Sequence, residues 1–332
     1  MGFVGFHGAN GRLRISERKV IVNGSQTKHE LPPPKIWAVG GGKGGVGKSS
    51  VSILIALELA RLNKRTIIID ADLGGANLHT LMGIRTPART LQDFVTRKYD
   101  SLEEICIQTP MPNLQIVCGA SEILSMANPQ YAQKNKIVQS IMGLAADHVV
   151  LDLGAGTSYN VLDFFLIAEN PIVVVTPQPI SIQNAYAFVR NAVYRKISRL
   201  AGQHPALQEL IKTAMDPKND SRMRTISDLL KTIGKVYQPE LAATLHNAIG
   251  EIRPWIVTNL ARHDRDRNAG RIIQLVAEKY LTVKVRELGA ISYDMAIEKM
   301  ISQMQPLSKL PPDCIARSDT TPLVRQLIGR VT

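Results

Sequence analysis

A glycine-rich segment with two lysines is the part of the sequence that points most directly to a chemistry. Residues 42–49 read Gly-Lys-Gly-Gly-Val-Gly-Lys-Ser and match the pattern G-x-x-x-x-G-K-[ST]. Glycines here let backbone N–H groups converge on phosphate oxygens, because no Cβ atom obstructs the approach. We expect Lys48 to reach the β- and γ-phosphates of a nucleotide and the Ser49 hydroxyl to bind Mg²⁺. The predicted nucleotide-binding residues of this segment are Gly42, Lys43, Gly44, Gly45, Val46, Gly47, Lys48, Ser49 and Ser50.

Lys43 adds a second lysine, five positions before Lys48. Two ammonium groups so close to each other repel unless an anion lies between them. The pair therefore favours a site for a polyphosphate. The alternative interpretation of Lys43 is a solvated loop lysine.

Acidic residues follow two apolar runs that have the composition of buried strands. Asp70 and Asp72 end the run that begins at Thr66, and Asp152 lies near the end of the run that begins at Val149. A carboxylate at a strand's end, facing a phosphate loop, can orient water or hold Mg²⁺. The alternative is that these acids only cap their own loops through local hydrogen bonds.

Short apolar runs alternate with helical patterns from residue 35 onward, and they must position these side chains. Helical patterns are expected at Ser49–Leu62, Asn128–Leu144 and Ile182–Arg199. Most of the runs are apolar at consecutive positions, which is typical of a parallel sheet covered on both faces. The alternation predicts an α/β fold with a doubly wound, mostly parallel sheet, whose ligands bind beyond the carboxyl ends of the strands. The predicted strands are Ile36–Val39, Thr66–Ile69, Leu114–Val117, Val149–Leu153, Ile172–Thr176, Trp255–Thr258 and Val283–Leu288.

Three regions depart from this rhythm and define the expected domain organisation. Residues 1–34 carry a net charge of +3 and end in a triple proline, which predicts a flexible basic extension. Residues 35–316 form the nucleotide-binding domain, with a helical insertion at about 200–250. Residues 317–332 are expected to form a C-terminal helix.

The phosphate loop resembles the deviant Walker A motif, Lys-Gly-Gly-x-Gly-Lys-[Ser/Thr], of the MinD/ParA family of P-loop NTPases. The resemblance covers about residues 35–310 and implies an ATPase that requires ATP and Mg²⁺. It also implies that Lys43 crosses the interface of a nucleotide-sandwiched dimer and contacts the partner's ATP. Catalytic roles would then fall on Lys43, Lys48 and Asp72.

Roles for the acids and for two further residues also come from this resemblance. The segment around Asp72 resembles the family's switch I, in which this acid positions the attacking water, and Asp70 would support Mg²⁺ or the loop. Asp152 resembles the Walker B acid, which holds Mg²⁺, and Gly156 would give a backbone N–H to the γ-phosphate. Asn259 resembles the asparagine that reads the adenine base, with the segment 176–179 on the other side of the base. The resemblance thus implies that the residues at the Mg²⁺ site are Ser49, Asp70, Asp72 and Asp152.

Three further segments resemble the FlhG branch of this family, also called FleN or YlxH. They are residues 70–77, 152–158 and 291–294. That branch counts and places flagella. The N-terminal Asp-Gln-Ala activation motif of FlhG does not occur in residues 1–34.

Composition narrows the function classes. The net charge is +12, and residues 191–290 carry more than half of the excess, which favours anionic partners such as nucleic acid or acidic lipid. The three cysteines are widely scattered, which argues against a metal-cluster carrier and fits a cytoplasmic protein. Tyr293 is the last tyrosine, so the C-terminal tyrosine cluster of a bacterial tyrosine kinase is absent from the sequence. No apolar run reaches the length of a membrane-spanning helix.

We therefore expect a dimerising switch ATPase that positions or counts a cellular structure and hydrolyses ATP slowly, stimulated by a protein partner. The expected partners are a second copy in the ATP state, an activating protein, and either a membrane or non-specific DNA. Residues 320–332 could form an amphipathic helix that holds the inner membrane, but packing of that helix on the domain's own core is the favoured interpretation. The alternative function is a ParA-type partition ATPase bound to the nucleoid.

Overall fold

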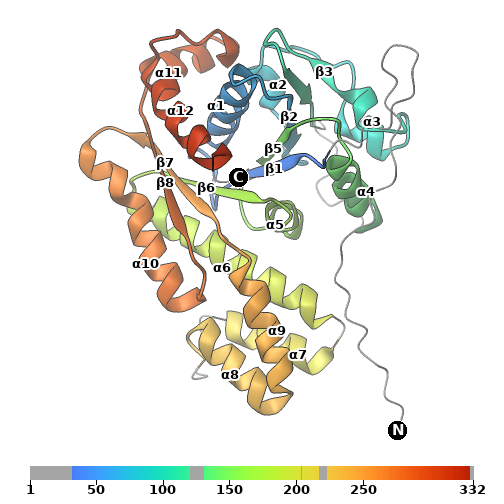
Figure 1. The fold of residues 1–332 in the computed structure, drawn as a ribbon, viewed down its shortest axis with the longest axis vertical. Helices are drawn as coiled ribbons and strands as arrows, with labels where there is room; N and C mark the ends of the chain where they lie inside the picture. Colours follow the sequence, from blue (N-terminus) through green and yellow to red (C-terminus); the bar gives the residue numbers. More distant parts are fainter. Residues whose placement is uncertain (1–31, 120–130, 203, 217–222, 330–332) are drawn as a thin grey trace.

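The apolar runs of the sequence form one eight-stranded sheet (Figure 1). The computed structural model describes residues 32–119, 131–202, 204–216 and 223–329, so the predicted extension 1–34 lies outside the described residues except for its last three. The strand order is β3-β4-β2-β5-β1-β6-β7-β8, and all pairs are parallel except β3 with β4. The strands are β1 (Lys35–Gly40), β2 (Thr66–Ala71), β3 (Ile107–Gln108), β4 (Leu114–Val117), β5 (His148–Leu153), β6 (Asn170–Val175), β7 (Trp255–Ala261) and β8 (Arg286–Ser292).

Helices cover both faces of this sheet, as the doubly wound fold requires (Figure 1). Helices α1, α11 and α12 lie over one face, and α5, α6 and α10 lie over the other. The helices are α1 (Lys48–Arg61), α2 (Leu78–Leu81), α3 (Leu91–Val95), α4 (Tyr131–Met142), α5 (Tyr159–Leu166), α6 (Pro179–Ala201), α7 (Pro205–Met215), α8 (Ile226–Val236), α9 (Pro239–Gly250), α10 (Ala269–Leu281), α11 (Met295–Ser302) and α12 (Ile315–Ile328), with short 3-10 turns at Glu103–Ile105, Asp264–Asn268 and Leu307–Lys309.

Consecutive apolar residues of a strand serve two different cores. In β1, Ile36 and Ala38 belong to the core beneath α5 and α6, whereas Trp37 and Val39 belong to the core beneath α1 and α12. This follows from the two-residue period of a strand, which sends neighbouring side chains to opposite faces. The sheet is therefore fixed from both sides.

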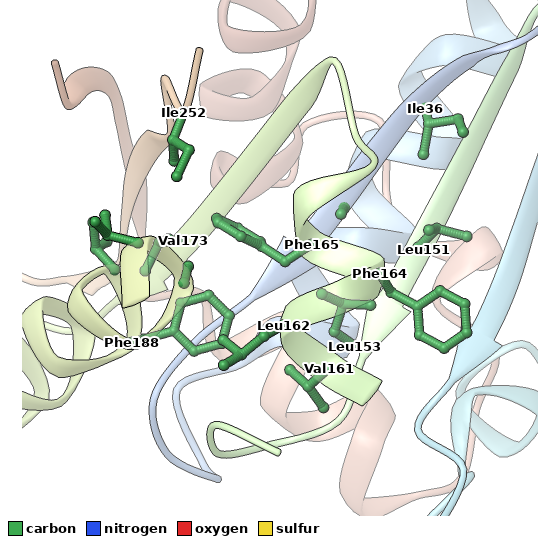
Figure 2. Close-up of a cluster of buried hydrophobic side chains, with 14 of the residues drawn as sticks. Ile36, Leu151, Leu153, Val161, Leu162, Phe164, Phe165, Val173, Phe188 and Ile252 are labelled. Carbon is green, nitrogen blue, oxygen red and sulfur yellow. The ribbon is translucent and has the colours of Figure 1, made fainter. Parts of the chain in front are cut away.

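Aromatic packing joins α5 and α6 to the sheet (Figure 2). The rings of Phe165 and Phe188 meet edge to face, with centroids 4.9 Å apart. Phe164, which directly precedes Phe165 in α5, is also fully buried. These contacts hold the helix that follows the β5 loop against the centre of the sheet.

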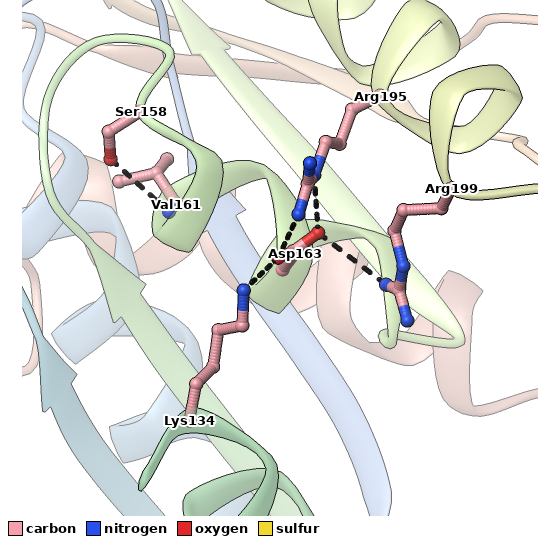
Figure 3. A network of polar contacts seen from close by, with 6 residues as sticks. All are labelled: Lys134, Ser158, Val161, Asp163, Arg195 and Arg199. Atoms are coloured by element: carbon pink, nitrogen blue, oxygen red, sulfur yellow. Dashed lines mark hydrogen bonds and ion pairs between the residues drawn. The ribbon is translucent and has the colours of Figure 1, made fainter. Parts of the chain in front are cut away.

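An ion-pair network ties α4 to the same two helices (Figure 3). Asp163 on α5 is buried and accepts hydrogen bonds of 2.9 Å from Nε and Nη2 of Arg195 on α6. Lys134 on α4 and Arg199 on α6 also pair with its carboxylate. Burial would raise the pKa of Asp163, but the hydrogen bonds from Arg195 and Lys134 lower it instead. The acid therefore stays ionised and clamps three helices together.

The predicted helical insertion is present and follows the end of α6 in the chain (Figure 1). It consists of α7, α8 and α9, which pack on one another and on α6. Prolines begin α7 and α9, at the helix position that tolerates a missing N–H. The insertion is far from the carboxyl ends of the strands, so it does not form the site described below.

Two strand predictions differ from the structure. The last strand was expected at Val283–Leu288, but β8 runs from Arg286 to Ser292, because its pairing with β7 begins at Arg286, opposite Trp255, and continues through Gly289 to Ser292. β3 was not predicted, since two antiparallel residues leave no periodic pattern. Of the helix predicted at Asn128–Leu144, the described part is α4, and residues 128–130 lie outside the described chain.

The C-terminal helix α12 packs on the domain. Leu323, Val324 and Leu327 are buried against the core that contains α1 and β8. Its apolar face is thus already covered, while Val331 lies outside the described residues. Among the described residues, no helix combines the length and apolar character needed to cross a membrane.

A buried histidine lies at the amino end of the sheet. His148 is 3% exposed, and its Nδ1 accepts a hydrogen bond of 3.0 Å from Trp37 Nε1. Burial, followed by the charge of Lys35, lowers the pKa of His148 to about 4. The neutral ring is therefore part of the folded structure.

This burial predicts an acid-sensitive contribution to stability. The unfolded chain binds a proton at His148 below about pH 6.5, whereas the folded chain binds one only near pH 4. The contribution of the neutral His148 to the free energy of unfolding is therefore fully present above about pH 6.5 and is lost as the pH falls toward 4. Between pH 7 and 5 the wild type should lose about 2 kcal/mol of unfolding free energy relative to His148→Gln. Urea unfolding at the two pH values measures this difference. His246→Gln, at an exposed position of α9, should follow the wild type; equal pH dependence of all three proteins would contradict the prediction.

Candidate functional site

The strand order brings the predicted loops to one edge of the sheet. β1, which precedes the glycine-rich loop, lies beside β5, and β5 lies beside β2. Asp70 of β2 is directly opposite Asp152 of β5 in the register of this pair. The carboxyl ends of three adjacent strands therefore carry the loop and both acids.

The glycine-rich loop has the backbone that its glycines predict. Gly45 and Gly47 have φ angles of +81° and +85°, in the left-handed region that favours glycine, and α1 begins at Lys48. At Gly42 a Cβ atom would lie 2.1 Å from the Asn184 carbonyl oxygen of α6, so only glycine lets the loop approach that helix. A Cβ atom at Gly44 or Gly45 would instead meet no atom of the described residues within 4 Å, so the loop is open at these two positions.

The two lysines of the loop are placed differently. Lys48 is buried, and its Nζ donates to the Lys43 carbonyl oxygen at 3.4 Å. Burial lowers the pKa of Lys48, and the charges of Asp152 and Asp72 oppose this shift. The Lys43 side chain is exposed. One ammonium group thus lies inside the site and the other on its rim.

Asp152 is held from the first turns of α1. Its Oδ1 accepts a hydrogen bond of 2.8 Å from Ser52 Oγ, and Ser49 also hydrogen-bonds to the carboxylate. Burial raises the pKa of Asp152 to about 6, although the bonds from Ser49 and Ser52 lower it. Asp152 and the predicted Mg²⁺ ligand Ser49 are therefore in contact.

Asp70 fixes the loop that follows β2. Its carboxylate oxygens accept backbone N–H groups of Leu78 at 3.0 Å and Asp72 at 3.2 Å. Burial, together with the charge of Asp152, raises the pKa of Asp70 to about 7. The Asp72 carboxylate lies against the β5 loop, because a Cβ atom at Gly154 would be 2.9 Å from its Oδ1. Asp70 therefore positions the loop that carries Asp72.

A cavity of about 500 Å³ opens beside the glycine-rich loop, which is large enough for a nucleoside. Asn259, from the end of β7, lines it and donates from Nδ2 to the Val46 carbonyl oxygen at 2.9 Å. On the far wall the Arg262 guanidinium lies 3.9 Å from the centre of the Tyr293 ring. The lining comprises Gly45, Gly47, Ser50, Leu54, Asn259, Leu260, Arg262, Ser292, Tyr293, Asp294, Ile297, Glu298, Ile301 and Ser302.

The structure brings together most of the predicted site residues but not all. Segment 176–179 does not line this cavity; Pro177 lines a separate hollow with Arg271 and Ile272 of α10. Arg262 and Tyr293 were not assigned to the site from the sequence. Tyr293 follows directly after β8, whose end was predicted at Leu288, four residues too early. The predicted strand pattern therefore did not place Tyr293 beside the glycine-rich loop.

The residues present fit a nucleotide with Mg²⁺. A nucleotide with Mg²⁺ needs oxygen ligands for the metal and a cation for the phosphates. The buried carboxylates of Asp70 and Asp152, together with the Ser49 hydroxyl that bonds to Asp152, supply the oxygens, and the buried Lys48 ammonium supplies the cation. A Cβ atom at Gly44, Gly45 or Gly156 would meet no atom of the described residues within 4 Å, so these loop positions leave room for a bound group. Within the described ranges, no group of three or more His, Cys, Asp or Glu side chains is placed to hold a metal by itself.

Fold and loop together define a P-loop NTPase. A family model described as "ParA: NUBPL iron-transfer P-loop NTPase" matches residues 34–197. The antiactivator FleN of Pseudomonas aeruginosa is 38% identical over 162 residues, which cover 48% of this chain and 57% of that protein. The flagellum site-determining protein YlxH of Helicobacter pylori is 31% identical over 158 residues, covering 47% and 53%. The matches thus span about half the length of these relatives.

Solved structures agree on the fold. The cell division ATPase MinD of Pyrococcus furiosus has a TM-score of 0.59 at 19% identity, covering 90% of this chain and 99% of that one. MinD of Pyrococcus horikoshii, in a complex with Mg-ADP, also has a TM-score of 0.59 at 19% identity, covering 89% and 96%. The matched part of the chain, residues 34–197, belongs to the ParA/MinD family of P-loop NTPases, and its relatives fit the FlhG branch.

The contact between Asn259 and the loop predicts a stability effect. Asn259→Asp replaces the amide donor with a carboxylate facing the Val46 carbonyl oxygen in a buried place. We expect a loss of about 2 kcal/mol of unfolding free energy, the cost of an unsatisfied buried acceptor. Urea unfolding at pH 7 measures it, with Asn247→Asp at an exposed position of α9 as the matched control. Equal stability of the two variants would show that the amide contact contributes nothing.

Proposed function

We propose that the chain is an ATP-dependent dimerising switch ATPase that regulates the number or placement of a cellular structure, of the flagellar type. The placement of the two lysines carries this proposal. Lys48 lies at the buried acids, where it would bind the nucleotide of its own chain, whereas Lys43 of the same loop is exposed. An exposed ammonium beside a triphosphate site is available to the nucleotide of a second copy.

The residues suggest how ATP would be bound and hydrolysed to ADP and phosphate. The loop N–H groups and Lys48 would hold the phosphates, and Ser49 with Asp152 would hold Mg²⁺, which neutralises phosphate charge during the reaction. Asp72, on the loop fixed by Asp70, would orient the water that adds to the γ-phosphorus. The Gly156 N–H would contact the γ-phosphate. Hydrolysis would remove this contact, which would release the loops after β2 and β5 and separate the two subunits.

Names of the relatives support the flagellar role over the alternative. FleN is named an antiactivator and YlxH a flagellum site-determining protein. A ParA-type partition ATPase is less supported, although Arg262, Arg265, Arg267 and Arg271 give the region after β7 an exposed basic surface. Membrane contact through α12 would require that helix to leave the core in which Leu323, Val324 and Leu327 are buried. An activating protein partner remains part of the proposal.

Lys43→Ala tests the pairing of subunits. The variant should bind ATP with nearly wild-type affinity, since Lys48 remains, but should stay monomeric because the partner's phosphates lose their second cation. Light scattering after size exclusion, with ATP and Mg²⁺, measures the mass. Lys235→Ala, an exposed lysine of α8, should dimerise like the wild type. A dimer of Lys43→Ala at wild-type concentrations would refute the assigned role.

Asp72→Ala tests the hydrolysis step. The variant should retain ATP binding and accumulate as the dimer, because only water positioning is removed. Turnover should fall by about 100-fold or more, as for loss of a positioned proton acceptor. Phosphate release and scattering measure the two effects, with Asp264→Ala, an exposed acid after β7, as control. Turnover at the wild-type rate would count against Asp72.

A further inference from the structure

The end of β8 forms one wall of the cavity beside the glycine-rich loop. Ser292, Tyr293 and Asp294 line the cavity there, opposite Gly47 and Ser50 of the loop and α1. The position of this wall decides how much room a nucleoside has.

Regular strand pairing holds this wall only in part. The register of β7 with β8 shifts between Thr258 and Ala261, just before the wall is reached. After the shift Ala261 pairs with Ser292, and Tyr293 N donates to the Ala261 carbonyl oxygen at 2.9 Å. Further contacts that place the wall come from outside the sheet.

Asp319 of α12 supplies the first of these contacts. Its Oδ2 accepts the Ser292 backbone N–H at 2.7 Å, a charge-assisted hydrogen bond. Arg267 Nη2 lies 3.9 Å from Asp319 Oδ1 and donates to Ser292 Oγ at 2.9 Å. One carboxylate therefore fixes both the strand end and the arginine next to it.

The first turn of α12 supplies a second contact. Asp294 Oδ2 accepts the Ala316 N–H at 3.2 Å and lies 3.0 Å from Cys314 Sγ. Its Oδ1 accepts the Ala296 N–H at 2.8 Å, which caps α11. The three elements around the cavity rim are joined through this acid.

Apolar packing then connects α12 to the opposite wall. Leu323, Val324 and Leu327 are buried in the core shared with α1, the helix that begins at Lys48. Leu323 also lies against Gly289 of β8, where a Cβ atom would be 2.4 Å from Leu323 Cδ2. The same helix thus contacts the element that carries the phosphate loop and the strand that bounds the nucleoside cavity.

We propose that α12 sets the width of the nucleoside cavity and that Asp319 is the positioning residue through which it does so. The inference goes beyond the proposed function and rests on it only in that the cavity takes the nucleoside of ATP. Asp319 acts on the nucleoside wall and not on the phosphate loop. Its loss should therefore weaken binding of a nucleotide but not of its polyphosphate alone.

The test compares two ligands of the full chain by isothermal titration with Mg²⁺: ATP and inorganic tripolyphosphate. Asp319→Ala should bind ATP about tenfold more weakly, as expected for the loss of one charge-assisted hydrogen bond. Its affinity for tripolyphosphate should equal that of the wild type. Asp319→Asn keeps an acceptor for Ser292 N–H but loses the charge toward Arg267, so it should show a smaller loss, about threefold.

Thr321→Ala is the matched control, because its hydroxyl donates to the Arg317 carbonyl oxygen within α12, and this variant should bind both ligands normally. If Asp319→Ala does not fold, Asp319→Asn and Arg267→Ala carry the same comparison. Equal losses for ATP and tripolyphosphate, or no loss for ATP, would overturn the inference. A wild-type chain that binds no ATP would instead overturn the proposed function, so the two failures are distinguishable.

Discussion

Charge burial at one edge of the sheet is the constraint on which the site depends. Two carboxylates, Asp70 and Asp152, face each other across neighbouring strands, and the Lys48 ammonium is buried beside them. Each of these groups loses hydration. As a result the pKa values of the two acids are raised and that of Lys48 is lowered, which favours the neutral form of each group. Such a cluster is costly unless a ligand brings the missing charges, which a metal ion and a polyphosphate would do.

The rest of the fold keeps this cluster in place. Both faces of the sheet are packed, so the carboxyl ends of β1, β2 and β5 cannot shift independently. Hydrogen bonds that the backbone N–H groups of Leu78 and Asp72 donate to Asp70 then pass this rigidity to the β2 loop. On the side of the β5 loop, the Asp163 clamp and the Phe165–Phe188 contact anchor α5 (Figures 2 and 3).

Sequence patterns were sufficient for the parts of the site that depend on local rules. The glycine-rich loop needs particular residue types at fixed spacing, and buried parallel strands give apolar runs that end at Asp70 and Asp152. A doubly wound, mostly parallel sheet could then be inferred from the alternation with helices. A helical insertion at about 200–250 was also predicted, and the structure has α7, α8 and α9 there.

The parts that sequence reasoning missed depend on contacts between distant segments. β8 continues past Leu288 because Gly289 accommodates Leu323 of α12, and no local pattern encodes that approach. The stacking of Arg262 on Tyr293 likewise joins two strand ends that are adjacent only in the folded sheet. Asn259 was expected to face a base, and the structure adds a contact with Val46 that lies 213 positions away.

In the proposed dimer, one subunit's exposed lysine completes the nucleotide site of the other, and mixing two defective chains tests this pairing. A Lys48→Ala chain cannot hold ATP but still offers its Lys43, whereas a Lys43→Ala chain holds ATP but lacks the forward cation. Neither should dimerise alone, and an equimolar mixture should form heterodimers with one intact composite site and recover part of the ATP turnover. A mixture that stays as monomeric and inactive as its components would contradict the claim.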